Sequence, residues 1–164
     1  MATLTNLESK LGEVTGLAMA AKTATSTVTK LARKEDKGLV ETLREMAQEA
    51  AETEKRCKAL GGSFDGKKSA ILQEARETKE KAAEMMGIYL DEEADALDGF
   101  EFLTMAEAGE VGHWEVLGEL AKAAGHREVR ELVEWALPIQ QRHFETARSA
   151  SARLAAAEDP NEES

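Results

Sequence analysis

Two pairs of polar residues with the same spacing stand out in the second half of the sequence. Glu110 and His113 form an E-x-x-H motif, and Gln140 and His143 form a Q-x-x-H motif. Residues three apart in a helix lie on the same face, and carboxylate oxygen and imidazole nitrogen are common ligands of transition metals. The two motifs therefore predict either a metal site or a buried polar layer whose members bond one another.

Each motif lies on a row of mainly apolar residues that recur every three or four positions, which is the spacing of one helix face. The first row consists of Leu103, Ala106, Glu110, His113, Leu117, Leu120 and Ala124. The second row consists of Val129, Val133, Ala136, Gln140, His143, Ala147, Ala150 and Leu154. The motifs thus occupy positions that are predicted to face the core.

Gly125 separates the two rows and is typical of the turn that ends a helix. Glu110 lies fifteen residues before it and Gln140 fifteen residues after it. In an antiparallel helix pair these positions have about the same height, with His113 and His143 about one turn away. We therefore predict a single polar layer, satisfied either by a metal ion or by hydrogen bonds within the layer and to water.

Other carboxylates could supplement such a layer. Glu107 precedes Glu110 by one turn, and Glu49 and Glu52 lie three apart in the second predicted helix, where a solvated helix face is the alternative. A two-metal site in a helical bundle uses about four carboxylates and two histidines, but the first predicted helix has no acid on its apolar row. The site is therefore predicted to be incomplete or to hold one metal ion, with the candidate ligands Glu110, His113, His143, Gln140, Glu107, Glu49 and Glu52.

The spacing of apolar residues predicts helices throughout the chain and no β-strands. Helices are expected at about residues 3–33, 39–60, 67–90, from a bend in 90–99 to 124, and 127–157. The third is heavily charged with a thin apolar stripe, so we expect a crossover that lies against the other four. The predicted fold is all-α, a four-helix bundle with a helical crossover between the second and third main helices. Residues 1–157 form this domain, and residues 158–164 form a disordered acidic tail.

The composition argues against several classes of partner. The net charge of −11 disfavours nucleic acid, whose phosphates require clustered Lys and Arg. No apolar stretch approaches the roughly 20 residues of a membrane-spanning helix, and the N-terminus lacks the pattern of a signal peptide. The single cysteine, Cys57, cannot form an internal disulfide bond. We therefore expect a cytoplasmic protein that binds neither nucleic acid nor membranes.

Two segments resemble the YciE/YciF-like stress proteins of the ferritin-like superfamily. They are TKLARKEDKGLVETLREMAQEAAETEK (29–55) and EAGEVGHWEVLGELAKAAGHREVRELVEWALPIQQRHFE (107–145). The resemblance implies a ferritin-like bundle, often dimeric, with a two-metal pocket. By position it implies metal-site residues at Glu107, Glu110, Gln140, His143, Glu49 and Glu52. The histidine expected in the second helix is missing, and the expected first-helix glutamate falls near Ala21, so the metal chemistry departs from the family pattern.

The leading hypothesis is a ferritin-like protein that binds iron or manganese between its last two main helices and takes part in a stress response. Its expected partners are the metal ion and a second copy of the chain in a homodimer. If the protein is an enzyme, the expected reaction is at most an oxidation of Fe(II) by oxygen or peroxide. The alternative is a metal-free helical-bundle scaffold or stress protein whose polar layer fixes the register of the helices.

Overall fold

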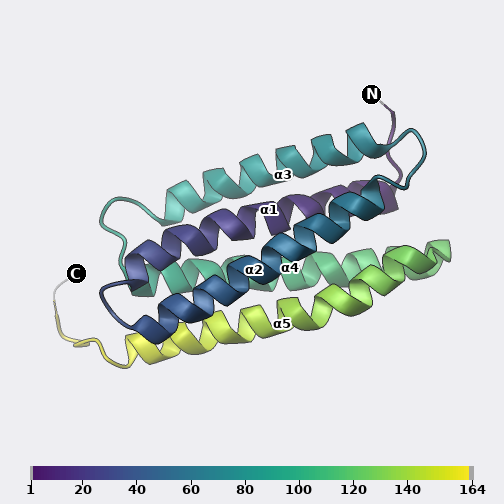
Figure 1. The fold of residues 1–164 in the computed structure, drawn as a ribbon. Coiled ribbons are helices and arrows are strands. Elements are labelled where there is room, and N and C mark those ends of the chain that lie inside the picture. The colour runs from purple at the N-terminus through teal and green to yellow at the C-terminus, as the bar shows by residue number, and fades with distance from the viewer. Residues whose placement is uncertain (1, 163–164) are drawn as a thin grey trace.

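The computed structural model describes residues 2–162, and in this range the chain forms five α-helices and no β-strands. The helices are α1 (Asn6–Ala32), α2 (Lys37–Gly61), α3 (Lys68–Tyr89), α4 (Ala96–Ala124) and α5 (Arg127–Ala155). Figure 1 shows α1, α3 and α5 running in one direction and α2 and α4 in the other. The prediction of an all-α protein is confirmed. None of the helices in the described range is long and apolar enough to cross a membrane.

Capping groups set the helix ends close to the predicted residues. α1 starts later than predicted because the Thr5 hydroxyl accepts a hydrogen bond from the amide of Glu8, whose carboxylate accepts one from the Thr5 amide. Asp95 and Asp98 form the same reciprocal pair at the start of α4, inside the segment that was expected to bend. Gly125 ends α4 with a φ of 64°, a left-handed conformation that favours glycine, so the predicted turn is confirmed.

The last helix ends slightly before the predicted residue 157. α5 ends at Ala155, and turns follow, in which the Ala157 amide donates to the carbonyl of Leu154 and the Glu162 amide to that of Asp159. Glu163 and Ser164, which belong to the tail that was expected to be disordered, lie outside the described residues.

The core consists of two apolar clusters with a polar layer between them. The first cluster has members from all five helices, among them Leu11, Cys57, Ile71, Trp114 and Val129. The second has members from α1, α2, α4 and α5, among them Val28, Leu43, Phe100, Leu103 and Ala147. Between the two clusters, α4 carries the buried Glu107 and Glu110, and α5 carries the buried Gln140 and His143. Three of the four predicted layer residues, all except His113, are therefore core residues.

α3 packs mainly on α1, through the first half of its own length. Gly12 and Gly16 of α1 permit the close approach, because a Cβ on Gly16 would lie 2.3 Å from the carbonyl oxygen of Ala75. A Cβ on Gly12 would lie 2.7 Å from the Cβ of Glu74. The second half of α3 is mostly exposed, and Ile88 keeps 77% of its surface accessible. α3 thus connects α2 to α4 along the outside of α1 (Figure 1).

The row of α4 that faces the core differs from the predicted row on both sides of Glu110. The row that is buried consists of Leu103, Glu107, Glu110, Trp114, Leu117 and Ala121. These residues are also three and four apart, so the spacing alone permits both rows. Trp114 is fully buried, whereas the side chain of His113 is 40% exposed. The prediction that His113 faces the core is wrong, because burying the larger indole ring removes more apolar surface from water.

Candidate functional site

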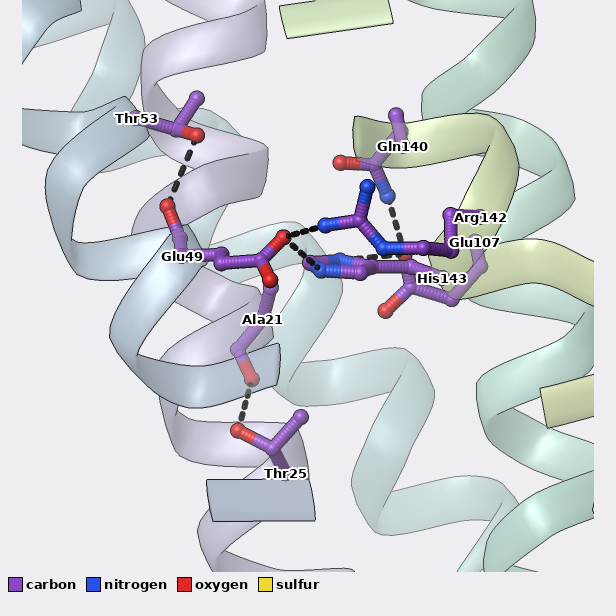
Figure 2. Close-up of polar contacts among 8 residues, drawn as sticks. All are labelled: Ala21, Thr25, Glu49, Thr53, Glu107, Gln140, Arg142 and His143. Atoms are coloured by element: carbon purple, nitrogen blue, oxygen red, sulfur yellow. Dashed lines mark hydrogen bonds and ion pairs between the residues drawn. The ribbon is translucent and has the colours of Figure 1, made fainter. Parts of the chain in front are cut away.

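A chain of polar contacts crosses the bundle from α4 through α5 to α2 (Figure 2). Gln140 donates a hydrogen bond from its Nε2 to the Oε2 of Glu107. The Nδ1 of His143 lies 3.8 Å from the same oxygen, and its Nε2 lies 3.1 Å from the Oε2 of Glu49. The imidazole of His143 is therefore buried between two carboxylates that belong to different helices.

Arg142 forms the solvent-facing end of this chain of contacts. Its guanidinium donates to the Oε2 of Glu49, the oxygen that also faces the imidazole. On either side of these contacts, the hydroxyls of Thr25 and Thr53 donate to the backbone carbonyls of Ala21 and Glu49 (Figure 2). Most polar groups of the layer are therefore satisfied by contacts within the protein.

Burial shifts the protonation equilibria of the layer. It raises the pKa of Glu107 to about 8, although the hydrogen bond from Gln140 acts in the opposite direction. It raises the pKa of Glu110 well above its ordinary value, and the nearby Glu107 raises it further. Burial lowers the pKa of His143, an effect that Glu49 partly opposes. Near neutral pH these shifts favour the protonated forms of Glu107 and Glu110 and the neutral form of His143.

His113 lies apart from this chain of contacts, against α1. Its Nδ1 is 3.1 Å from the Oε2 of Glu13 and 3.3 Å from the Nζ of Lys10, and these two residues also pair with each other. The predicted layer that contains both histidines is therefore not formed. His143 lies opposite Glu107 instead, each of them eighteen residues from the turn between α4 and α5.

An apolar cavity of about 260 Å³ lies between α1, α3 and α4, beside the polar layer. Small side chains form much of its α1 and α3 walls, among them Ala20, Ala21, Ala24, Ala82 and Ala83. α3 follows α1 closely at the two glycines of α1. Further along both helices, alanines face the space between the backbones and leave it unfilled.

Three polar residues of α4 also line this cavity, namely Glu107, Glu110 and His113. Gln140 bonds Glu107, and His113 contacts α1, but the carboxyl group of Glu110 forms no hydrogen bond or ion pair within residues 2–162. Glu110 is only 4% exposed. Trp114, one turn further along α4, has a fully buried indole N–H that lacks a partner in the described range, whereas the carboxyl oxygens of Glu110 are not fully buried and line the cavity. Burying such groups without partners is costly, and a ligand that pairs with Glu110 would relieve part of that cost.

The donor groups do not fit the two-metal centre that the resemblance implies. Within residues 2–162, no group of three histidine, cysteine or carboxylate side chains is arranged to hold a metal ion. The two ring nitrogens of His143 face different carboxylates. The carboxylate of Glu49 already binds the guanidinium of Arg142, whose charge repels a cation. Ala21 stands where the resemblance implies a glutamate, and it lines the cavity.

Five of the seven predicted ligands are brought together. Glu49, Glu107, Gln140 and His143 form the chain of contacts, and Glu110 follows Glu107 along the cavity wall. The other two lie elsewhere: His113 contacts α1, and Glu52 forms surface ion pairs with Arg56 and Lys55.

Sequence reasoning missed two features of the site, the guanidinium of Arg142 and the cavity. The sequence does not indicate which way the flexible side chain of Arg142 points, even though the neighbouring His143 faces the core. The cavity had a visible signal, because Ala20, Ala21 and Ala24 stand at mid-helix, where larger apolar side chains would fill the core.

The arrangement combines an apolar cavity with a carboxyl group that donates a hydrogen bond when protonated and binds a cation when ionised. Cys57, which Glu110 influences electrostatically, adds no reactivity, because burial raises the pKa of its thiol to about 12. These features are those of a binding site. No family model, curated protein or solved structure matches the chain.

Proposed function

We propose that the protein binds a small, largely apolar organic molecule in the cavity between α1, α3 and α4. The observation that carries this function is Glu110, a buried carboxyl group without a partner in the described residues, in the wall of an otherwise apolar cavity. Apolar pockets that contain a few polar groups with shifted pKa values are the usual form of ligand sites. A cavity of about 150 Å³ binds benzene, which has six non-hydrogen atoms. In proportion, the cavity of about 260 Å³ accommodates about ten non-hydrogen atoms.

We infer in addition that the bundle is ferritin-like, with α1, α2, α4 and α5 as the main helices and α3 as the crossover. The antiparallel order of the helices and the shallow burial of α3 support this arrangement (Figure 1). Under this proposal, Ala21 replaces the glutamate of the first main helix, and the binding cavity takes up the space of the missing side chain.

Filling the cavity is expected to abolish binding. Ala106 lines the cavity, whereas Ala108 on the same helix is exposed and does not line it. Saturation-transfer NMR with 1-hexanol, a neutral apolar probe, is expected to give a signal for the wild-type protein. The signal should fall at least tenfold in Ala106→Phe and persist in Ala108→Phe. Equal signals from all three proteins would contradict binding in this cavity.

A second proposal is a single iron or manganese ion bound at the polar layer. The observation that favours it is the buried His143, with the carboxylates of Glu49 and Glu107 on its two sides. Binding would require the imidazole and a carboxylate to turn toward a common point and Glu49 to leave Arg142. The metal-free alternative is a structural layer whose hydrogen bonds fix the register of α4 against α5.

Metal analysis distinguishes these alternatives. If a metal ion binds, the protein purified without chelator is expected to carry close to one equivalent of iron or manganese, and EDTA should lower its melting temperature. His143→Ala should lose the metal, whereas the matched control His126→Ala, at the start of α5, should keep it. Equal metal content in all three proteins, or a melting temperature that EDTA leaves unchanged, would exclude this second proposal and favour the structural layer.

A further inference from the structure

The charges around the cavity limit the chemistry of its ligand. Glu107 and Glu110 lie one turn apart on α4, and both line the cavity. Within residues 2–162, neither carboxylate forms an ion pair with a lysine or an arginine. Lys79 lines the cavity from α3 but pairs with neither of them. The cavity wall therefore contains two acidic groups that form no ion pair with a lysine or an arginine of the described residues.

We infer that the ligand is a small organic cation, an alkyl- or arylammonium ion whose ammonium group binds Glu110 and whose apolar part fills the cavity. This inference rests on the proposed function, because it names the ligand class for the same cavity. An ammonium ion favours the ionised form of Glu110 because it neutralises that charge, whereas the charge of an anionic ligand would oppose ionisation of both carboxyl groups. An ammonium ion adds the Coulomb attraction of an ion pair to its hydrogen bonds with an ionised Glu110, whereas a neutral alcohol forms a hydrogen bond alone.

The apolar walls suit an organic cation better than a metal ion. Met85, Met86 and Met105 offer polarisable thioether groups, and Phe102 offers an aromatic ring. A hard cation such as Ca²⁺ needs about six to eight oxygen ligands, and two carboxyl groups in an apolar cavity do not supply them. The net charge of −11 also raises the local concentration of cations around the protein.

Three probes with the same chain length and different head groups test the inference. Isothermal titration calorimetry of the full chain at neutral pH compares hexylamine, 1-hexanol and hexanoate. Hexylamine is expected to bind at least tenfold more tightly than 1-hexanol, and hexanoate is expected not to bind. Glu110→Gln should weaken the binding of hexylamine at least tenfold and leave that of 1-hexanol unchanged. Glu119→Gln, the matched control on the exposed face of α4, should change neither affinity.

The outcomes separate this inference from the proposed function. If 1-hexanol binds the wild-type protein as tightly as hexylamine does, the cavity binds neutral molecules and the inference is overturned, while the proposed function stands. An unchanged affinity of Glu110→Gln for hexylamine would also overturn the inference, provided that circular dichroism shows a folded variant. If none of the three probes binds the wild-type protein, the proposed function itself is contradicted.

Discussion

Replacing Glu110 by glutamine is expected to stabilise the folded protein by about 1–3 kcal/mol at about pH 8 and to leave its stability nearly unchanged at about pH 4. Glutamine preserves the volume of the side chain and removes its ionisable group. Glu110 is buried and has no partner in the described residues, so the folded protein must either keep it protonated or bury its charge. The substitution removes that requirement and changes little else in the core.

The direction of the pH dependence follows from proton binding. The folded-state pKa of Glu107 is about 8, against an ordinary value of 4.5, and that of Glu110 is raised in the same direction. As the pH rises above about 4.5, the unfolded chain releases protons that the folded protein retains, so the free energy of unfolding falls until the pH passes the folded-state pKa. The lowered pKa of His143 acts in the opposite direction below about pH 6.5, and this effect cancels when wild type and variant are compared.

Urea unfolding followed by circular dichroism, with EDTA present and over a series of pH values, measures this effect. The stability of the wild-type protein should fall from acid to neutral pH more steeply than that of Glu110→Gln. Glu119→Gln is the matched control, because Glu119 lies on the exposed face of the same helix, and it should keep the wild-type slope. Parallel curves for wild type and Glu110→Gln would show that the carboxyl group is not buried without a partner.

Replacing Gly16 by valine is expected to destabilise the protein by about 1–3 kcal/mol. A Cβ at this position would lie 2.3 Å from the carbonyl oxygen of Ala75 and 2.7 Å from the Cβ of Thr78. Both distances are far below van der Waals contact, and the nearer atom belongs to the backbone, so a rotamer change cannot relieve the overlap. α3 would have to move away from α1, which exposes Ile71 and opens the wall of the cavity.

Gly112→Ala is the matched control for this substitution. Gly112 lies in the interior of α4, and a Cβ there would meet no other group within 4 Å. Alanine is therefore expected to stabilise α4 by about 0.5–1 kcal/mol, because it restricts the unfolded chain more than glycine does. Chemical unfolding of the two variants compares the effects directly. A Gly16→Val protein as stable as the wild type would contradict the close packing of α1 against α3.

The helices and most of the core were predictable from the spacing of residue types. On α5, the predicted row from Val129 to Ala150 is buried, because a one-position shift would bring Arg130 and Glu134 into the core. Thr5, Asp95 and Gly125 act as caps whose effect depends on a few neighbouring residues. Such local signals are readable without tertiary structure.

The row of α4 shows where spacing alone was insufficient. Rows through His113 and through Trp114 both repeat at three and four residues, and both contain Glu110. The packing of α4 against its neighbours buries the indole and leaves the imidazole beside Glu13 and Lys10 on α1. The burial of Glu110, Gln140 and His143 was correctly predicted, but the pairing of His113 with His143 was not.

By itself, the sequence determined that the chain is helical, where its helices turn, and that polar residues interrupt the core of α4 and α5 at mid-length. These properties depend on periodicity and capping, which act over one or two helical turns. Only the tertiary structure decided that Glu49 and Glu107 flank His143, that Arg142 neutralises the outer carboxylate, and that a cavity lies beside Glu110. The distance between neighbouring helices determines which partners the long side chains reach and whether small side chains leave a cavity. That distance is set by residues far apart in the chain, such as Gly16 and Ala75.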